Sequence, residues 1–317
     1  MPEATVIIAA WCAEKTLERC VESALAQVGI DLEVVVVDDA SPDGTLACAQ
    51  ALADRYPNVH ALSLPQNGGP SAARNAALDV AKGAWIAVLD SDDAYRPNRL
   101  RTLIDFAQSG EVDIVCDALT FVDEAGAETP SPPLAHPSDP AQAPWVLSDY
   151  VYGNQLHNGT LSLGYLKPVF RTSFLRQHGL RYDETLRNGE DFHLVLAALF
   201  VGSCVRYSPE GGYLFTRRAG SISSKLNPDH AAALDQADAR FLEAHHQALS
   251  PEARQRMRVR MAQNANLATA EVAITELKAL RPHRAAGVLA KRPIAIHQFF
   301  KQIYEAAAKR SARLAKR

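Results

Sequence analysis

The short apolar run Trp85–Leu89 ends in three closely spaced carboxylates, those of Asp90, Asp92 and Asp93. An apolar run of this length is too short for a helix and predicts a buried strand. The acidic side chains would then follow its carboxyl end, which is the edge of an open α/β sheet where ligands bind. Carboxylates that repel one another there become favourable when a divalent cation bridges them to a diphosphate. The alternative is a turn whose Asp and Ser side chains only cap the next helix.

Three further apolar runs precede this one along the chain, and each is followed by a segment of helical spacing. They cover residues 6–10, 32–37 and 59–64. Strands that alternate with helices at such intervals predict right-handed crossovers and a mostly parallel, doubly wound sheet. A helix is expected next over 100–108, and another strand over 114–122. The N-terminal part of the chain is therefore predicted to be of the α/β class.

The composition changes after this last strand. Six prolines between residues 127 and 145 exclude a helix or a central strand. We expect a mobile loop there, either as a surface insertion or as a lid over the site. From Ala231 onward the sequence has helical periodicity. The predicted domains are 1–225, divided into halves 1–123 and 124–225, and a helical region with a basic tail over 226–317.

The net charge of −3 conceals an asymmetry between the body and the tail of the chain. Ten Lys or Arg and one acidic residue, Glu305, follow residue 280, so the tail carries about +9 and the body about −12. The tail is either a solvated helix or a basic amphipathic helix on an anionic membrane face. In the second case its apolar side consists of Ile294, Ile296, Phe299, Phe300, Ile303 and Tyr304. The acidic body and the lack of a recognised motif argue against nucleic acid as a partner.

The five cysteines are scattered and lack Cys-x-x-Cys spacing, so they indicate neither a disulfide framework nor a zinc site. No basic segment precedes the first apolar run, and no apolar stretch reaches the roughly 18 residues of a membrane span. We therefore expect a cytoplasmic protein. In the amphipathic alternative its tail makes a peripheral contact with the inner membrane face.

Four polar segments each follow a predicted strand or open a helix. They are Val36–Thr45 (VVDDASPDGT), Asn67–Asn75 (NGGPSAARN), Asp90–Asp93 (DSDD) and Gly189–Asp191 (GED). In order and spacing they resemble glycosyltransferase family 2, over about residues 4–225. Segments 164–170 and 220–223 make the chain most similar to bacterial exopolysaccharide enzymes of the succinoglycan glucosyltransferase type. The resemblance implies a GT-A fold, a UDP-sugar donor and inverting transfer of one hexose to a lipid-linked oligosaccharide or another glycan acceptor. In that subfamily the expected hexose is glucose.

The resemblance also implies roles for the donor side of the site. Asp39 would accept a hydrogen bond from the uracil imide, with Asp38 beside it, and Asp90 would contact the ribose. Asp92 would hold Mg²⁺ or Mn²⁺ on the diphosphate, and Arg74 would lie near the nucleotide or the diphosphate. These roles agree with the chemistry, because a hard cation bound by oxygen neutralises charge that develops on the leaving UDP.

On the acceptor side the resemblance implies that Asp191 is the general base, and one base suffices for inverting transfer. Glu190 is adjacent, but successive helical residues do not share a face, so only one of the pair should point at the reaction centre. Lys167, Arg217 and Ser221 are expected on the acceptor side.

The chain departs from the family pattern after the first strand. Ala9-Ala10-Trp11-Cys12 stands where the family often has Pro-x-Tyr-Asn, and we place Ala9 and Trp11 in the donor site. Near Thr216 and Arg217 a histidine that often precedes Gly-Ser-Ile-Ser is missing. The Gln-x-x-Arg-Trp signature of processive synthases is also absent, which favours a single addition.

Two other enzyme classes share much of this architecture. A sugar-phosphate nucleotidyltransferase needs a Gly-rich loop after the first strand, whereas residues 9–15 contain no glycine. A dinucleotide-dependent oxidoreductase needs Gly-x-Gly-x-x-Gly at the same place. The remaining alternative is a nucleotide-sugar-binding scaffold that has lost catalysis and docks to a membrane.

Overall fold

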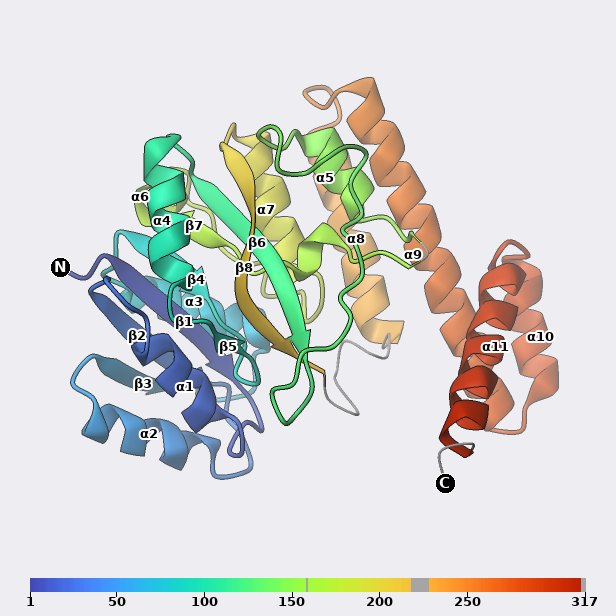
Figure 1. Ribbon diagram of the computed structural model, residues 1–317. Coiled ribbons are helices and arrows are strands. Elements are labelled where there is room, and N and C mark those ends of the chain that lie inside the picture. Colours follow the sequence, from blue (N-terminus) through green and yellow to red (C-terminus); the bar gives the residue numbers. More distant parts are fainter. Residues whose placement is uncertain (158, 218–227, 315–317) are drawn as a thin grey trace. The chain divides into compact units, whose positions relative to one another are not determined.

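An eight-stranded sheet forms the centre of residues 1–221 in this computed structural model, which describes residues 1–157, 159–217 and 228–314 (Figure 1). The strands are β1 (Ala4–Ala10), β2 (Leu32–Asp38), β3 (Val59–Ser63), β4 (Trp85–Val88), β5 (Ala94–Tyr95), β6 (Ile114–Val122), β7 (Val169–Arg171) and β8 (Val205–Thr216). Their order is β3-β2-β1-β4-β7-β6-β8-β5. β5 and β7 run antiparallel to their neighbours, and the other six strands are parallel. The predicted α/β class and mostly parallel sheet are confirmed.

Helices cover both faces of the sheet. They are α1 (Leu17–Leu25), α2 (Thr45–Arg55), α3 (Pro70–Val80), α4 (Arg99–Ser109), α5 (Leu147–Gly153), the 3₁₀ helix η1 (Leu163–Tyr165), α6 (Thr172–Gln177) and α7 (Glu190–Phe200). In Figure 1, α1 and α4 lie in front of the sheet, and α3 and α7 lie behind it. The continuous apolar sequence of β2 follows from this arrangement, because all four side chains of Val34–Val37 are fully buried.

The parallel strands bring the candidate site residues to one edge of the sheet. Ala10 at the end of β1 pairs with Asp38 at the end of β2, and β4 runs parallel to β1 on its other side. The segments that follow these strands therefore emerge side by side. They contain Trp11, Asp39 and Asp90.

The structure adds two short strands that the sequence did not predict. β5 has two residues and β7 has three, too few to show a period of their own. β7 follows the 3₁₀ helix η1 after a gap of three residues. The expected strand over 114–122 is confirmed with the same bounds as β6.

The proline-rich segment 127–145 is packed onto its neighbours. The amide of Thr129 donates to Phe121 O at 2.7 Å, and that of Ala135 donates to Leu161 O at 2.9 Å. Trp145 is buried, and its ring stacks on that of Tyr150 with 5.9 Å between centroids. These contacts hold parts of the segment against its neighbours, and a role as a mobile lid stays a prediction.

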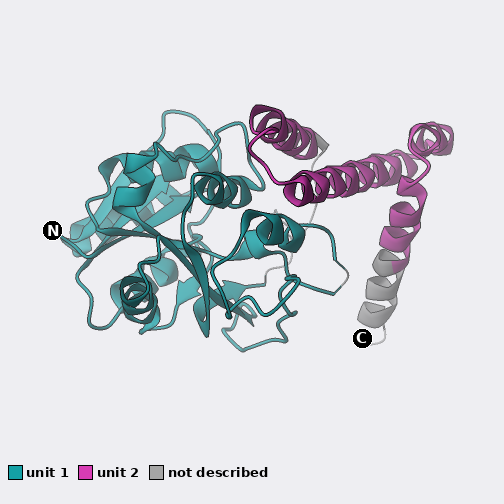
Figure 2. Cartoon of the chain, turned by 90° about the horizontal axis from the view of Figure 1, so that it is seen from above, with its two compact units in different colours: residues 1–221 teal, residues 222–317 magenta. Residues whose placement is uncertain are grey.

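Residues 222–317 form a second compact unit, drawn in magenta in Figure 2. Its helices are α8 (Pro228–Ala244), α9 (Pro251–Lys278), α10 (Pro282–Lys291) and α11 (Ala295–Leu314). Ser250 caps α9, because its Oγ accepts from the amide of Ala253 at 3.1 Å. The helical C-terminal region predicted from the sequence is present, but the boundary predicted at residues 225 and 226 lies outside the described residues.

The second unit has a small core of its own. Ala270 and Ala273 of α9 pack with Ala285 of α10 and Phe299 of α11. Small alanine side chains allow the three helices to approach closely around the one large ring. None of the helices in the described part of the chain is long and apolar enough to cross a membrane.

Candidate active site

Asp90 follows the carboxyl end of β4 and pairs with two cations. Its Oδ1 lies 2.8 Å from Arg74 Nη2, and its Oδ2 lies 2.9 Å from Lys167 Nζ. Burial raises the pKa of Asp90, but the charges of Lys167 and Arg74 outweigh that effect and lower it to about 2. Asp90 is therefore a carboxylate at neutral pH.

The same two cations bind the acidic pair at the start of α7. Arg74 Nη1 lies 2.7 Å from Glu190 Oε1 and 3.3 Å from Asp191 Oδ1. Lys167 Nζ lies 2.8 Å from Asp191 Oδ2. We call these five side chains the ion-pair cluster; it joins α3, the β4 turn, the segment before β7, and α7. Burial alone would lower the pKa of Arg74 and of Lys167, but the surrounding carboxylates raise both.

One oxygen of this cluster is left without a donor. Asp191 Oδ1 is buried and accepts no hydrogen bond within the described part of the chain, although Arg74 is close enough for an ion pair. A buried carboxylate oxygen without a donor is costly unless a ligand supplies one. Asp191 Oδ1 is thus suited to accept a hydrogen bond from a substrate hydroxyl.

Asp39, which follows β2, holds the loop that opens α3. Its carboxylate accepts from the amide of Gly68 at 2.7 Å, the amide of Gly69 at 2.8 Å and Asn67 Nδ2 at 2.9 Å. From the other side, Arg187 Nη1 donates to Asn67 Oδ1 at 2.6 Å. Loop 67–69 is therefore clamped between the end of β2 and the segment before α7.

The contact of Asp39 with uracil stays a prediction, because the carboxylate already accepts three hydrogen bonds from this loop. Among the described residues, Gly68 N alone donates to its Oδ1, and an oxygen with one donor has a second lone pair for a ligand. Asp38 is buried, and its carboxylate accepts from the amide of Ser41 at 3.2 Å. Its contacts thus shape the turn after β2.

Ala9 and Trp11 flank the end of β1. Ala9 lies within the strand, in register with Val37 of β2. Trp11 follows the strand and is 48% exposed, so its ring is accessible to a ligand. Donor contacts from these residues stay predictions.

The turn that follows Asp90 is fastened to β8. Asp93 is buried; its Oδ1 accepts from the amide of Thr216 at 2.7 Å and its Oδ2 from the hydroxyl of Tyr213 at 2.8 Å. Arg19 Nη2 donates to the carbonyl oxygen of Asp92 at 2.5 Å and to Thr216 Oγ1 at 3.0 Å. Sequence reasoning missed the roles of Arg19, Tyr213 and Arg187. Asp93 stood in the quoted motif, but no local pattern pairs it with β8.

The comparisons with known proteins agree with the motifs. Residues 5–160 match the family model described as glycosyl transferase family 2. Succinoglycan biosynthesis protein ExoO of Rhizobium meliloti (strain 1021) is 42% identical over 243 residues, which cover 76% of this chain and 68% of ExoO. The chain belongs to glycosyltransferase family 2. It is therefore a glycosyltransferase, as predicted from its sequence.

Two solved structures share the fold of this family 2 glycosyltransferase. S. aureus TarS 1–349 in complex with UDP-GlcNAc has a TM-score of 0.58 at 20% identity and covers 90% of each chain. Mannosyltransferase PcManGT from Pyrobaculum calidifontis, in complex with GDP-Man and Mn²⁺, also has a TM-score of 0.58 at 20% identity, over 97% of this chain and 86% of that chain. A likeness at this identity shows the fold, and the GT-A fold is confirmed.

The described residues of this family 2 glycosyltransferase are compatible with a metal ion that takes most of its ligands from the diphosphate of the substrate and few from the protein. Among the described side chains, no three from His, Cys, Asp or Glu gather into a metal cage. A divalent ion on a diphosphate needs only one or two protein carboxylates. Asp92 is half-buried, and its charge contributes, after burial and Asp90, to a raised pKa of Asp93. Asp92 thus supplies one carboxylate at the place where the metal is predicted.

The structure describes two of the three residues predicted for the acceptor side, Lys167 and Arg217. Lys167 belongs to the ion-pair cluster. Arg217 is exposed, with its guanidinium 4.4 Å from the ring centroid of Phe121 and a hydrogen bond of 3.1 Å to Pro130 O. Ser221 lies outside the described residues. An acceptor role for each stays a prediction.

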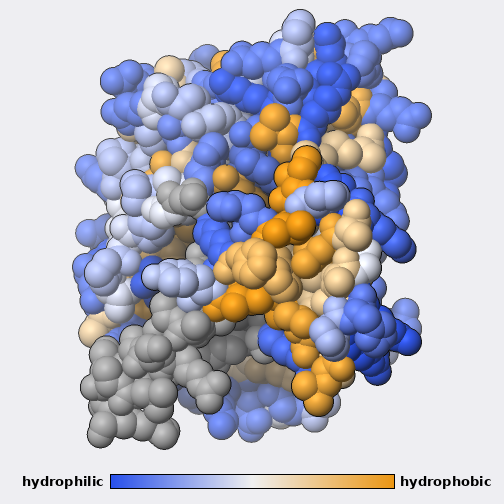
Figure 3. Space-filling view, turned by 90° about the vertical axis from the view of Figure 1, so that its right-hand side faces the viewer, coloured by the Kyte–Doolittle hydropathy of each residue, from blue (hydrophilic) through white to orange (hydrophobic). Residues whose placement is uncertain are grey.

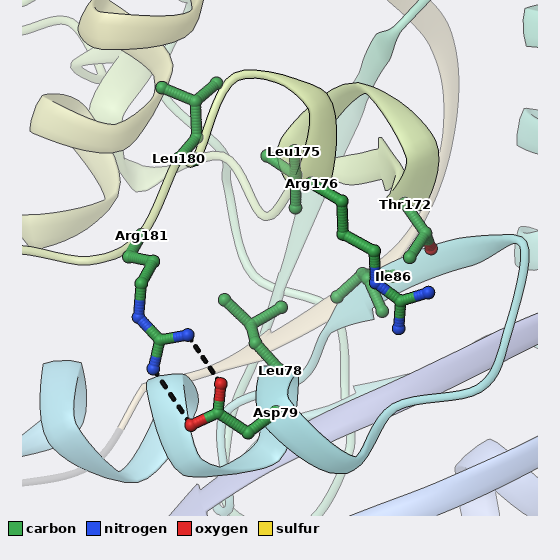
Figure 4. Close-up of a pocket in the computed structure, with 9 residues that line it drawn as sticks. Leu78, Asp79, Ile86, Thr172, Leu175, Arg176, Leu180 and Arg181 are labelled. Carbon is green, nitrogen blue, oxygen red and sulfur yellow. Dashed lines mark hydrogen bonds and ion pairs between the residues drawn. The ribbon is translucent and has the colours of Figure 1, made fainter.

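A pocket of about 270 Å³ lies away from these residues (Figure 4). Ile86 near the start of β4, Leu78 of α3 and Leu175 of α6 line it, and Arg181 pairs with Asp79 at one side. Asp90 follows the other end of β4, so this pocket is not the predicted donor site.

Proposed function

We propose that this enzyme transfers one hexose, glucose by preference, from a UDP-sugar to a hydroxyl of a lipid-linked oligosaccharide during exopolysaccharide synthesis. The observation that carries the proposal is the buried Asp191 Oδ1, which receives no hydrogen bond from a described residue and lies in the same ion-pair cluster as Asp90. A base role for Asp191 is supported by its position in the same cluster as Asp90, the carboxylate predicted to contact the donor ribose. The biosynthetic role is supported by the likeness to ExoO, whose name assigns it to succinoglycan biosynthesis.

The choice of donor and metal is supported by the structural neighbours. TarS was solved with UDP-GlcNAc, and PcManGT with Mn²⁺. We infer that this chain uses a UDP-sugar with Mg²⁺ or Mn²⁺, held on the diphosphate with Asp92. When bound, the metal supplies positive charge to the departing diphosphate.

In the proposed mechanism Asp191 Oδ1 accepts the proton of the acceptor hydroxyl as that oxygen attacks the anomeric carbon. The bond to UDP breaks on the opposite side, so the configuration inverts, through a transition state of oxocarbenium character. Glu190 Oε1 is occupied by Arg74 Nη1 at 2.7 Å. We therefore assign the base role to Asp191 and a structural role to Glu190.

UDP release from a panel of UDP- and GDP-sugars, with Mg²⁺ or Mn²⁺, tests this function. We expect turnover with a UDP-hexose, and a loss of about 100-fold or more in kcat for Asp191→Asn. The Kd of this variant for UDP should remain within about threefold of wild type, because Asp191 is not among the residues proposed to contact the nucleotide. Turnover by Asp191→Asn at the wild-type rate contradicts its role. If UDP binds but no donor is consumed, the chain is instead a catalytically silent binding scaffold.

We further propose that α11 contacts the anionic membrane that carries a lipid-linked acceptor. Phe300 follows Ile296 by four residues, and Ile303 and Tyr304 follow Phe300 by three and four, so all four lie on one helical face. They are 39% (Ile296), 62% (Phe300), 38% (Ile303) and 76% (Tyr304) exposed. Figure 3 shows hydrophobic side chains gathered in a band on the side of α10 and α11. The surplus of basic residues after residue 280 complements an anionic surface. Phe299, predicted on this apolar face, is instead buried in the core of the second unit.

Sedimentation with vesicles tests the membrane contact. We expect the double variant Phe300→Ser with Tyr304→Ser to bind phosphatidylglycerol vesicles at least about fivefold more weakly than wild type, since two apolar contacts are lost. Val80→Ser is the control, because Val80 is an exposed apolar residue of α3. Equal sedimentation of the double variant and wild type contradicts the membrane proposal.

A further inference from the structure

The backbone of Lys167 is held by a hydrogen bond to its carbonyl oxygen and by the proline that follows it. These constraints limit where its ammonium group can lie. Its carbonyl oxygen accepts from Arg99 Nη2 at 2.6 Å. Arg99 is itself locked by Asp117, with 2.7 Å between Nη2 and Oδ1 and both side chains fully buried. Pro168 follows and restricts Lys167 to an extended backbone. The position of the ammonium group is thus set by the protein before any substrate binds.

That ammonium group bridges the two carboxylates on which the proposed reaction depends. Nζ lies 2.8 Å from Asp191 Oδ2 and 2.9 Å from Asp90 Oδ2, and the side chain is 8% exposed. An ammonium group has three donors, and these contacts use two of them. A charge-assisted bond of this length fixes one carboxylate oxygen and thereby the orientation of the other.

We infer that Lys167 is a positioning residue for the base: it holds Asp191 Oδ2, so that Asp191 Oδ1 is left to accept the hydrogen bond of the acceptor hydroxyl. The inference rests on the proposed transferase function. The two oxygens of Asp191 differ as this role requires, because Oδ2 receives Lys167 and Oδ1 receives no hydrogen bond from a described residue.

Arg74 would compete for Asp191 Oδ1 if Lys167 were removed. Its Nη1 lies 3.3 Å from Asp191 Oδ1, just outside a well-formed hydrogen bond. Without Lys167, Arg74 is the remaining cation of the cluster beside Asp191. Rotation of the carboxylate toward Arg74 would engage the oxygen that must accept the proton. Asp90 would still be held by Arg74 Nη2 at 2.8 Å, so the donor side should be less affected.

The test compares Lys167→Met, Lys167→Arg and the control Lys82→Met in the full chain. Lys82 is exposed two residues after the end of α3, outside the ion-pair cluster. With the UDP-sugar that wild type consumes, we expect Lys167→Met to lower kcat by about 100-fold while the Kd for UDP stays within about threefold. Lys167→Arg keeps a cation with several donors and should recover at least about tenfold of the lost kcat. Lys82→Met should match wild type.

Three results would overturn the inference. One is a kcat for Lys167→Met within about threefold of wild type. Another is a Kd of Lys167→Met for UDP that rises by the same factor as its kcat falls, which would indicate that Lys167 contacts the nucleotide. The third is a Lys167→Arg variant that melts at the wild-type temperature but is no more active than Lys167→Met. A wild-type enzyme that consumes no nucleotide sugar contradicts the proposed function itself, and this is seen before any variant is compared.

Discussion

The hydroxyl of Tyr213 donates a hydrogen bond to Asp93 Oδ2 at 2.8 Å. The same hydroxyl oxygen accepts from the amide of Asp90 at 3.1 Å. Tyr213 belongs to β8, so one buried phenol connects this strand to both ends of the acidic turn. The turn that carries the predicted metal ligand therefore has a rigid support, which is what a site for a bound diphosphate requires.

Tyr213→Phe should lower the free energy of unfolding. The substitution leaves Asp93 Oδ2 buried without its donor, and such a loss costs about 1–3 kcal/mol. Equilibrium denaturation in urea measures the change. Tyr165→Phe is the matched control, because Tyr165 is exposed and should change stability by less than about 0.5 kcal/mol. Equal stability of Tyr213→Phe and wild type would show that this hydrogen bond contributes nothing to the fold.

Asp93 should make the stability of the protein depend on pH. Burial, and then the charges of Asp90 and Asp92, raise the pKa of Asp93 well above its usual range. Above about pH 4 the unfolded chain releases a proton that the folded protein retains. The folded state then binds more protons, so the free energy of unfolding falls as the pH rises from about 4 toward the raised pKa.

Asp93→Asn removes this proton and should flatten that part of the curve. The stability of the variant relative to wild type is therefore expected to increase as the pH rises from about 4 to about 7. Urea denaturation at a series of pH values, without metal or nucleotide, measures the difference. A difference that does not change over this interval contradicts a raised pKa for Asp93.

Metal removal should abolish turnover, and Asp92 should set the metal requirement. We expect EDTA to stop UDP release, and excess Mn²⁺ to restore it. In Asp92→Asn the Mn²⁺ concentration for half-maximal activity should rise at least about tenfold, because an amide binds a hard cation less well than a carboxylate. Asp54→Asn, an exposed change in α2, serves as control. An unchanged Mn²⁺ requirement in Asp92→Asn would remove Asp92 as the metal ligand.

The fold was largely predictable because its signals are local. The apolar residues Val34–Val37 and the interval between successive strands contain the information for a buried parallel sheet. β5 and β7 carry no such signal, since each gains its hydrogen bonds from a strand distant in the sequence. Their formation depends on tertiary partners and is not encoded in a local period.

The candidate site likewise contains residues that local motifs predict and contacts that they do not. Asp90 and Asp191 were recognised because each stands in a short motif at the end of a strand or the start of a helix. The contacts that fix them join distant residues: Arg74 and Glu190 are 116 positions apart, and Tyr213 and Asp93 are 120 apart. With one sequence, no pattern connects such positions. Lys167 was therefore assigned to the acceptor side, and its bridge between Asp90 and Asp191 became visible only in the structure.

Loop 67–69 requires a glycine at position 69 for two reasons. The backbone there is left-handed, and the side chain of Arg187 lies against it. The φ of Gly69 is +87°, and an added Cβ would lie 3.2 Å from Arg187 Cγ. Its amide also donates to Asp39 Oδ2 at 2.8 Å. Gly69→Ala should therefore strain the backbone, displace Arg187 and loosen the hold of Asp39 on the loop.

We expect Gly69→Ala to raise the Kd for UDP at least about tenfold, which corresponds to about 1.4 kcal/mol. Gly126→Ala separates strain from site geometry, because Gly126 has a similar φ of +86° but no atom within 4 Å of an added Cβ. That control should lose stability through backbone strain while its Kd for UDP, measured by calorimetry, stays at the wild-type value. Equal effects of the two substitutions on UDP binding would mean that loop 67–69 does not shape the nucleotide site, and that the clamp between Asp39 and Arg187 serves the fold alone.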